Sequence, residues 1–221
     1  MSRVFWFRRD LRLNDNPALN AAIHGSVADG DSKVAAVYAV DLDAFYALSG
    51  IRQHSLVASL DALGESMGRM LTIRHASKES GTSVADALVA MAKKVEAKIV
   101  HATRAFDPAG VAEQNAVGLA LAAQGVFLEL TGSYYAVDPG AVAKPDGSPY
   151  KVYTPYFKRW FEIGWDKPEA LAEVGHRWFI AEPCQGRPTP SKTRLLKSKP
   201  VRPMPCAPGS GSRSARCSTT T

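Results

Sequence analysis

Short apolar runs recur along residues 1–131, separated by longer segments of mixed polarity. A continuous apolar run of four to eight residues is typical of a strand that is buried on both faces of a sheet. Five segments are interpreted as such strands, four of which include charged or polar residues: 4–7, 33–40, 71–74, 98–101 and 126–130. The pattern therefore predicts five buried strands.

The segments between these runs show helical spacing. Asn16-Pro17 supplies an N-cap residue followed by proline at the first helical position. Apolar residues spaced three or four apart predict a helix face further along, at Leu56, Leu60, Leu63, Met67 and Met70. Two more helices are predicted, one from Val84 to Val95 and one over about 109–124. Strand and helix thus alternate through this region.

This alternation predicts an α/β fold: a doubly wound, Rossmann-like, five-stranded parallel sheet with strand order 3-2-1-4-5. Sheets of this kind bind ligands at the carboxyl ends of their strands, where the winding direction reverses. The reversal lies between the first and fourth strands. Loops 8–16 and 102–109 should face that crevice, joined by the loop over 41–52 after the second strand.

Arg8, Arg9, Asp10 and Arg12 follow the first predicted strand directly. A guanidinium and a carboxylate at this point can bind an anionic or heteroaromatic ligand. They can equally pair with each other or with a neighbouring loop and stiffen the turn. Arg52 can also bind a ligand, or it can simply lie in solvent at the start of a helix. Asp107 precedes Pro108, and its alternative role is to cap the helix that begins there.

From Thr131 onward the chain is rich in turn residues. Prolines and glycines exclude a long helix before Tyr153, and a short helix is predicted from about Pro155 to Ile163. Trp160, Trp165 and the aromatic residues near them can stack on bases or pack against a neighbouring domain.

Charge is unevenly distributed along the 221 residues. The formal net charge is +6, but residues 184–221 hold eight of the 27 basic residues and none of the 21 acidic ones. The remainder carries a net −2, so the basic character gives no evidence for a DNA-binding face on the globular part. The last stretch has no aromatic residue and no periodicity, which predicts a disordered basic tail over 184–221.

Several familiar chemistries have no sequence signature here. The motifs GxGxxG, GxxxxGK[S/T] and HExxH are absent, and the five histidines have no ligand spacing. Cys184, Cys206 and Cys217 match neither a zinc site nor a redox pair. The N-terminus is charged, and no apolar run approaches the roughly 20 residues that span a bilayer. These features predict a cytoplasmic protein with no membrane segment.

Three sequence blocks together resemble the N-terminal part of the DNA photolyase/cryptochrome family. They are VFWFRRDLRLNDNPAL at 4–19, IRQHSLVASLDALGESM at 51–67 and DGSPYKVYTPYFKRW at 146–160. In that family this region is an α/β antenna domain that holds a light-harvesting deazaflavin, folate or flavin. A helical domain follows and binds FAD, whose reduced excited state splits pyrimidine dimers in DNA.

The resemblance implies an organisation for the chain: an antenna domain over 1–131, an interdomain linker with a short helix over 132–183, and the tail over 184–221. It also implies that the FAD site lies outside this sequence, so dimer repair by these residues alone is not expected. The implied partner of the full-length family is DNA carrying pyrimidine dimers.

The resemblance also implies a set of chromophore-binding residues. They are Arg9, Asp10, Asp41, Arg52, Phe106, Asp107 and Gly110. Relatives that bind folate use an Asn-Glu pair that has no counterpart at Ala109-Gly110. A deazaflavin, or an empty pocket, is therefore favoured over a folate.

Two other functions stay open. The chain can be a stand-alone α/β module that binds a nucleotide or a flavin-like ligand, or one half of a split photolyase completed by a separate helical FAD-binding chain. The tail is either a frameshift product or a genuine basic segment that binds DNA phosphates. Reading the adjacent DNA in the other two frames distinguishes these explanations.

Overall fold

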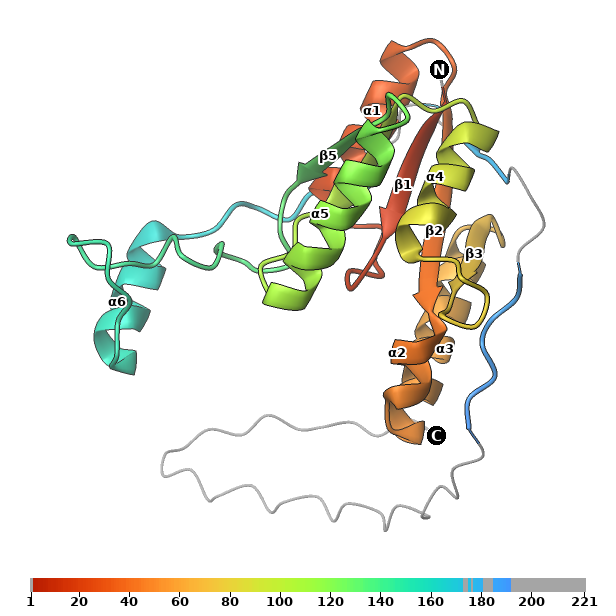
Figure 1. Ribbon diagram of the computed structural model, residues 1–221. Coiled ribbons are helices and arrows are strands. Elements are labelled where there is room, and N and C mark those ends of the chain that lie inside the picture. Colours follow the sequence, from red (N-terminus) through yellow and green to blue (C-terminus); the bar gives the residue numbers. More distant parts are fainter. Residues whose placement is uncertain (1, 173–174, 176, 181–184, 192–221) are drawn as a thin grey trace, which may run out of the picture.

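The computed structural model describes residues 2–191 except 173–174, 176 and 181–184. A parallel sheet forms its centre (Figure 1). Its strand order is β3-β2-β1-β4-β5. Its strands are β1 (Arg3–Phe7), β2 (Lys33–Asp41), β3 (Leu71–Ala76), β4 (Ile99–Thr103) and β5 (Phe127–Thr131). A two-residue strand, β6 (Arg177–Trp178), pairs with Lys33 and Val34 at the start of β2. The predicted fold and strand order are confirmed. Strand β6 was not predicted, because two residues are too few to form a recognisable sequence pattern.

Helices cover both faces of the sheet, as double winding requires. They are α1 (Pro17–Ala28), α2 (Leu42–Ala47), α3 (Gly50–Ser66), α4 (Val84–Lys94), α5 (Pro108–Ala122) and α6 (Tyr153–Ile163). Residues of α1 and α3 pack on one face, and residues of α4 and α5 pack on the other. No helix among the described residues has the length and apolar character needed to cross a membrane.

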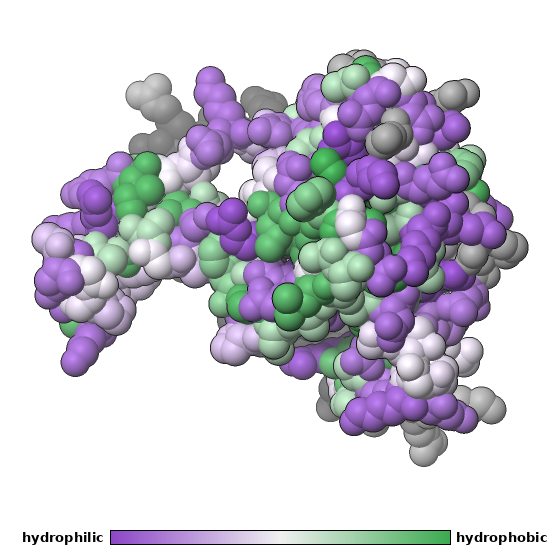
Figure 2. Space-filling model, turned by 45° about the horizontal axis from the view of Figure 1, so that its top comes forward, coloured by the Kyte–Doolittle hydropathy of each residue, from purple (hydrophilic) through white to green (hydrophobic). Residues whose placement is uncertain are grey.

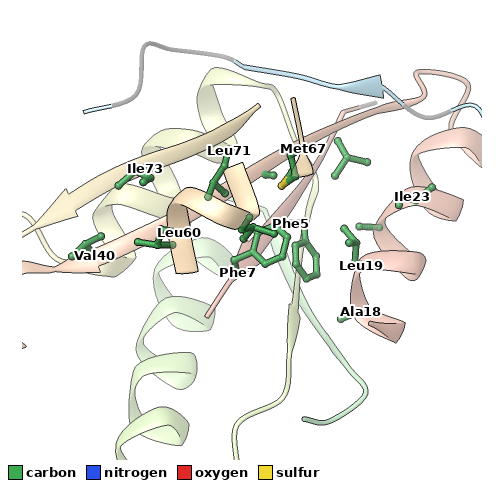
Figure 3. Packing of buried hydrophobic residues seen from close by; sticks show 14 of the residues in the cluster. Phe5, Phe7, Ala18, Leu19, Ile23, Val40, Leu60, Met67, Leu71 and Ile73 are labelled. Carbon is green, nitrogen blue, oxygen red and sulfur yellow. The ribbon is translucent and has the colours of Figure 1, made fainter. Parts of the chain in front are cut away.

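Alternate residues of β1 belong to two separate cores. Phe5 and Phe7 contact the α1 and α3 side, where their rings meet edge to face at 4.6 Å (Figure 3). Val4 and Trp6 point to the α4 and α5 side. All four are buried, and each large side chain contributes about 2 to 3 kcal/mol to the free energy of folding. The run VFWF is therefore continuous because both faces of the strand are covered.

Four of the described helices begin at side-chain caps, three of them at α1, α4 and α5. Asn16, Ser83 and Asp107 accept hydrogen bonds from backbone N–H groups in the first turns of α1, α4 and α5. These caps satisfy donors that have no partner within the helix. The predictions of an N-cap at Asn16 and of a capping role for Asp107 are confirmed.

Two local expectations differ from the structure. The predicted helix face extended to Met70, but α3 ends at Ser66, because Gly68 and Arg69 both have positive φ and turn the chain. The segment 41–52, predicted as a loop, contains α2 and the start of α3. Asp41 begins α2 by accepting a hydrogen bond from the N–H of Ala44 at 3.0 Å.

Helix α6 projects from the body on two extended arms, as the left side of Figure 1 shows. It begins at Tyr153, two residues before the position expected from the sequence, and ends at Ile163. The turns before it contain Gly140 and Gly147, both with positive φ. The chain then returns to the body, where Glu169 and Ala170 accept hydrogen bonds from Asn20 of α1.

The predicted disordered tail falls largely outside the described residues. Cys184 and residues 192–221, which include Cys206 and Cys217, belong to that part. Residues 185–191 are described, and they contact β3 and α3. The predicted tail begins at residue 184, so its first described residues, 185–191, are held against the domain and are not a free tail.

Candidate functional site

The carboxyl ends of β1 and β4 lie side by side, because Trp6 of β1 is in register with Ala102 of β4. Each strand continues into a charged or aromatic loop at this edge. Arg9 from the first loop forms an ion pair with Asp107 from the second, with 2.9 Å between Nη2 and Oδ1. The sheet thus brings together two predicted residues that are 98 positions apart in the chain.

Asp107 has two roles at this position. Its Oδ1 also accepts the backbone N–H of Gly110 at 3.0 Å, which caps α5. This hydrogen bond is the main cause that lowers the pKa of the Asp107 carboxyl, and the Arg9 charge adds to it. Asp107 is therefore a carboxylate, and the cap fixes its direction beside the crevice.

Gly110 is packed closely against this carboxylate. A Cβ atom at residue 110 would lie 2.7 Å from Oδ2 of Asp107 and 2.8 Å from Cβ of Ala105. Any larger residue would displace the cap or the loop. The close approach of Asp107 and Ala105 to residue 110 in the first turn of α5 therefore explains why this residue is glycine.

Arg8 lies behind the ion pair and is almost fully buried, with 9% of its side chain exposed. Its guanidinium donates to the carbonyl of Gly110 at 2.8 Å and to Glu113 at 2.8 Å, and it lies 4.5 Å from the centre of the Trp6 ring. A planar cation with several donors suits these differently placed partners. Arg8 therefore joins the loop after β1 to the first turns of α5.

Asp10 is a buried acid with one satisfied oxygen. Its Oδ1 lies 2.8 Å from Nε of Arg12, whereas Oδ2 is buried without a hydrogen-bond partner among the described protein atoms. Burial raises the pKa of this carboxyl, and the charge of Arg12 partly opposes the effect. A buried oxygen without a partner is uncommon and marks a place where a water molecule or a ligand donor fits.

Three aromatic residues border the crevice on its β5 side. Phe106 meets Tyr135 edge to face at 5.9 Å, and Tyr135 meets Tyr134 at 4.7 Å. The Tyr134 hydroxyl lies 3.5 Å from Oδ2 of Asp107. The carboxyl edge of β4 and β5 thus carries flat apolar surface beside the charged pair.

Asp41 and Arg52 occupy a different part of the carboxyl edge. Asp41 caps α2, and Arg52 is exposed in the first turn of α3. Within the described part of the chain, no hydrogen bond or ion pair joins either residue to the other five predicted site residues. The structure therefore gathers Arg9, Asp10, Phe106, Asp107 and Gly110 around β1 and β4, and leaves Asp41 and Arg52 on the neighbouring α2–α3 segment.

The sequence places Arg8 in the charged turn that can bind a ligand, but Arg8 is not in the predicted chromophore-binding set, and Gln114, Tyr134 and Tyr135 were not singled out. Gln114 is buried, and its Oε1 accepts from the backbone N–H of Ala105 at 3.0 Å and from Arg8 at 3.4 Å. The motif TGSYY directly follows the fifth predicted strand, so its position was a usable signal for the two tyrosines. No sequence pattern indicates that Gln114, inside a helix, supports the loop after β4.

The chemistry available here is recognition of a planar, polar molecule. Arg9 is 61% exposed and can bind an anionic group, while the aromatic residues can stack against a ring. The loop after β1 also borders an open groove of about 440 Å³, whose opposite wall is α3. Across the described ranges, no three His, Cys, Asp or Glu residues lie close enough to hold a metal ion.

A doubly wound parallel sheet with charged and aromatic loops at its winding reversal defines a class of ligand-binding α/β domains. The family model for DNA photolyase matches residues 3–173. This chain belongs to the DNA photolyase family, and its fold is that of the family's N-terminal domain.

Individual relatives agree with this assignment. The deoxyribodipyrimidine photo-lyase of Agrobacterium fabrum is 32% identical over 202 residues, which cover 89% of this chain and 39% of that protein. Among solved structures, a class III photolyase from Agrobacterium tumefaciens shares the fold with a TM-score of 0.62 and 24% identity, over 81% of this chain and 37% of that one. An archaeal photolyase from Sulfolobus tokodaii, solved with two FAD molecules, shares it with a TM-score of 0.59 and 17% identity, over 77% and 37%. The chain thus spans about two fifths of the length of these relatives.

Proposed function

We propose that this α/β domain binds a light-harvesting chromophore in the crevice between the carboxyl ends of β1 and β4. The observation that carries the proposal is the convergence of Arg9, Asp107 and the Phe106–Tyr135 pair at the winding reversal of the sheet. Arg9 would bind an anionic or carbonyl edge of the chromophore, and the aromatic rings would lie against its ring system. When bound, the chromophore would absorb light and pass the energy to a flavin.

The buried polar atoms beside the crevice fit such a ligand. Oδ2 of Asp10 and Nε of Arg8 are both buried without a hydrogen-bond partner among the residues that the structure describes. A ring with exocyclic N–H and carbonyl groups would satisfy one acceptor and one donor of this kind. The S. tokodaii relative, described as implying a novel light-harvesting cofactor, supports the same assignment.

A deazaflavin fits this site better than a folate. The tight contact of residue 110 with Asp107 leaves no space for a second acidic side chain at that position. A folate held by an Asn-Glu pair would need such a side chain. We therefore propose a deazaflavin, with Arg9, Asp10, Phe106, Asp107 and Gly110 around it and Asp41 and Arg52 at the outer side of the α2–α3 segment.

The light-driven repair of pyrimidine dimers in DNA belongs, in this proposal, to the whole photolyase. The chain spans 39% of the A. fabrum enzyme, so these residues would contribute the antenna and would depend on the flavin-binding remainder for catalysis. Blue-light illumination of the 221-residue protein with FAD and dimer-containing DNA tests this dependence. Dimer loss above that of a sample without protein would contradict it.

Chromophore binding is tested by mixing the purified protein with a deazaflavin, or in parallel with a folate, and titrating absorbance and fluorescence. Asp107→Asn keeps the helix cap but removes the charge that pairs with Arg9. We expect at least a tenfold weaker deazaflavin affinity in this variant and no change in Asp146→Asn, which alters an exposed turn. Equal affinity of Asp107→Asn and wild type, or no binding of either chromophore, would refute the proposed site.

A second function, docking of a separate helical chain, is favoured by the surface of α6. Its apolar side is open to solvent, with Tyr153 72%, Phe161 63% and the adjacent Trp165 53% exposed. Neighbouring aromatic rings of this segment contact each other, and Trp160 stacks on Trp165 with 4.8 Å between the ring centres. Figure 2 shows apolar and polar side chains together on this projecting arm. The proposed occupant is an apolar surface of the flavin-binding portion of a photolyase.

This docking is tested with the portion of the A. fabrum photo-lyase that lies beyond the matched region, produced as a separate polypeptide. Size-exclusion chromatography of the mixture should show a complex with the wild-type chain. The double variant Tyr153→Ser, Phe161→Ser should lose it, whereas Phe127→Ser, a change of an equally exposed residue on β5, should not. Separate elution of the two wild-type polypeptides would exclude this partner.

A further inference from the structure

Residues 185–191 form a short segment that lies along the outer edge of β3 and reaches α3. We call this segment the C-terminal latch. The backbone N–H of Gln185 donates to the carbonyl of Ile73 at 3.2 Å, and the Gln185 side chain accepts from the N–H of His75 at 2.6 Å. The latch therefore satisfies polar backbone groups on the side of β3 that faces away from β2.

The other end of the latch is held by a buried amide. Gln53, which is 2% exposed, accepts the backbone N–H of Ser191 at 2.8 Å through Oε1. Its Nε2 donates to the carbonyl of Leu48 at 2.8 Å. One side chain thus connects the latch to both the end of α2 and the start of α3.

Further contacts lie between these ends, beginning with the carbonyl oxygen of Gly186, which lies 3.0 Å from Nε2 of His75. Arg187 forms an ion pair with Asp61 of α3 and lies beside Gly64, where a Cβ atom would be 3.1 Å from its guanidinium. Pro188 is buried. Most of the contacts are polar, and six of the seven residues of the latch keep part of their surface in contact with solvent.

We propose that the C-terminal latch is a conformational device that opens independently of the sheet and, when closed, holds the α2–α3 junction and covers the edge of β3. A segment with little buried apolar surface opens at a lower free energy than the core strands. Opening leaves the amide oxygen of Gln53 without its latch donor and uncovers backbone groups of an edge strand. Exposed strand edges are sites where other chains add.

This device has a consequence for the arrangement of the carboxyl edge. Asp41 begins α2, and Arg52 is the immediate neighbour of Gln53, so the latch holds the segment that carries both residues. The device does not depend on the proposed chromophore site, and its test requires no chromophore.

The test compares amide hydrogen exchange in the full 221-residue chain and in two variants of one residue. Ser191→Pro removes the N–H that Gln53 accepts, and Ser191→Ala keeps it. We expect at least tenfold faster exchange in Ser191→Pro for His75 and for the amides at 46–53, with exchange in β1 and β4 unchanged. Ser191→Ala should stay closer to wild type than Ser191→Pro in these regions, because it keeps the N–H that Gln53 accepts.

Two outcomes would overturn the proposal. Unchanged exchange at His75 and 46–53 in Ser191→Pro would show that the latch does not hold them. A uniform increase that includes β1 and β4 would show that the segment opens only with the whole domain. As a second measurement, Gln185→Ala should accelerate amide exchange at His75 alone. An exchange rate at His75 equal to that of wild type would show that the Gln185 side chain does not hold the latch on β3.

Discussion

At the scale of single residues, the buried His101 illustrates how the sheet alters the chemistry of a side chain. It is 1% exposed, and Arg3 lies 3.0 Å from its Nε2, which is the acceptor in that contact because the guanidinium is the donor. Glu129 is 3.6 Å from Nδ1. Burial, with a further contribution from Arg3, lowers the pKa of His101 from 6.5 to about 4.

The lowered pKa predicts a loss of stability in acid. Because the folded-state pKa lies below that of the unfolded chain, the unfolded chain binds the proton first as the pH falls. The stabilisation is fully present above about pH 6.5 and is lost between pH 6.5 and 4, by on the order of 3 kcal/mol. Urea denaturation across this range should show a smaller pH dependence in His101→Gln than in wild type. His24→Gln, a change at an exposed histidine, should retain the wild-type profile.

Arg8 provides a second prediction at this scale. Replacing it with lysine keeps the charge but cannot reach Gly110, Glu113 and Gln114 together. We expect Arg8→Lys to lower the free energy of unfolding by about 2 kcal/mol, measured by urea denaturation at pH 7. Arg9→Lys changes an exposed ion pair and should cost less than about 1 kcal/mol. Equal effects of the two changes would contradict the structural role given to Arg8.

At the scale of elements, helix starts carry much of the local specification. Asn16 accepts the N–H of Leu19 at 3.1 Å and donates to the carbonyl of Arg12 at 3.0 Å, so it fixes both α1 and the charged loop before it. Pro17 at the next position has the φ angle that a first helical turn needs. The sequence signal Asn-Pro and the observed geometry agree for this reason.

The cap at Asn16 leads to a graded prediction. Asn16→Ala removes both hydrogen bonds at a buried position and should lower the free energy of unfolding by about 2 kcal/mol. Asn16→Ser retains a cap acceptor without the bond to Arg12, so it should fall between Asn16→Ala and wild type. Thermal or urea denaturation monitored by far-ultraviolet circular dichroism provides the comparison. An order other than wild type, serine, alanine would show that the cap does not hold the loop.

At the scale of the whole molecule, α6 and its arms form a long excursion between two well-attached parts. Ala172 donates to Asn20 at 3.0 Å, and β6 pairs with the start of β2, so the chain beyond the excursion is held by the body. Leu171 and Trp178 also pack against the core on the α1 side. The excursion can therefore be cut without separating its ends from the domain.

This arrangement predicts the behaviour of a cleaved chain. Lys151 and Lys158 are exposed in the arm and in α6, so brief trypsin digestion should cut there as well as in the basic tail predicted over 184–221. We expect the two pieces to elute together from a size-exclusion column in buffer and to separate in denaturing gel electrophoresis. Elution of the C-terminal piece alone would show that the contacts around Asn20 and β2 do not hold it.

The sequence by itself determined the layered architecture, because buried strands and amphipathic helices have different apolar periods and double winding of a parallel sheet follows from their alternation. It also determined the caps at Asn16 and Asp107, which are local, and the family blocks that identify the chain. The tertiary structure decided which charged residues meet. Arg9 pairs with Asp107 and Arg8 binds the start of α5, while Asp41 and Arg52 lie apart, since these partnerships depend on strand register and on three-dimensional distance. It also decided that Gln53 connects to Ser191 across 138 positions, a contact for which no local pattern exists.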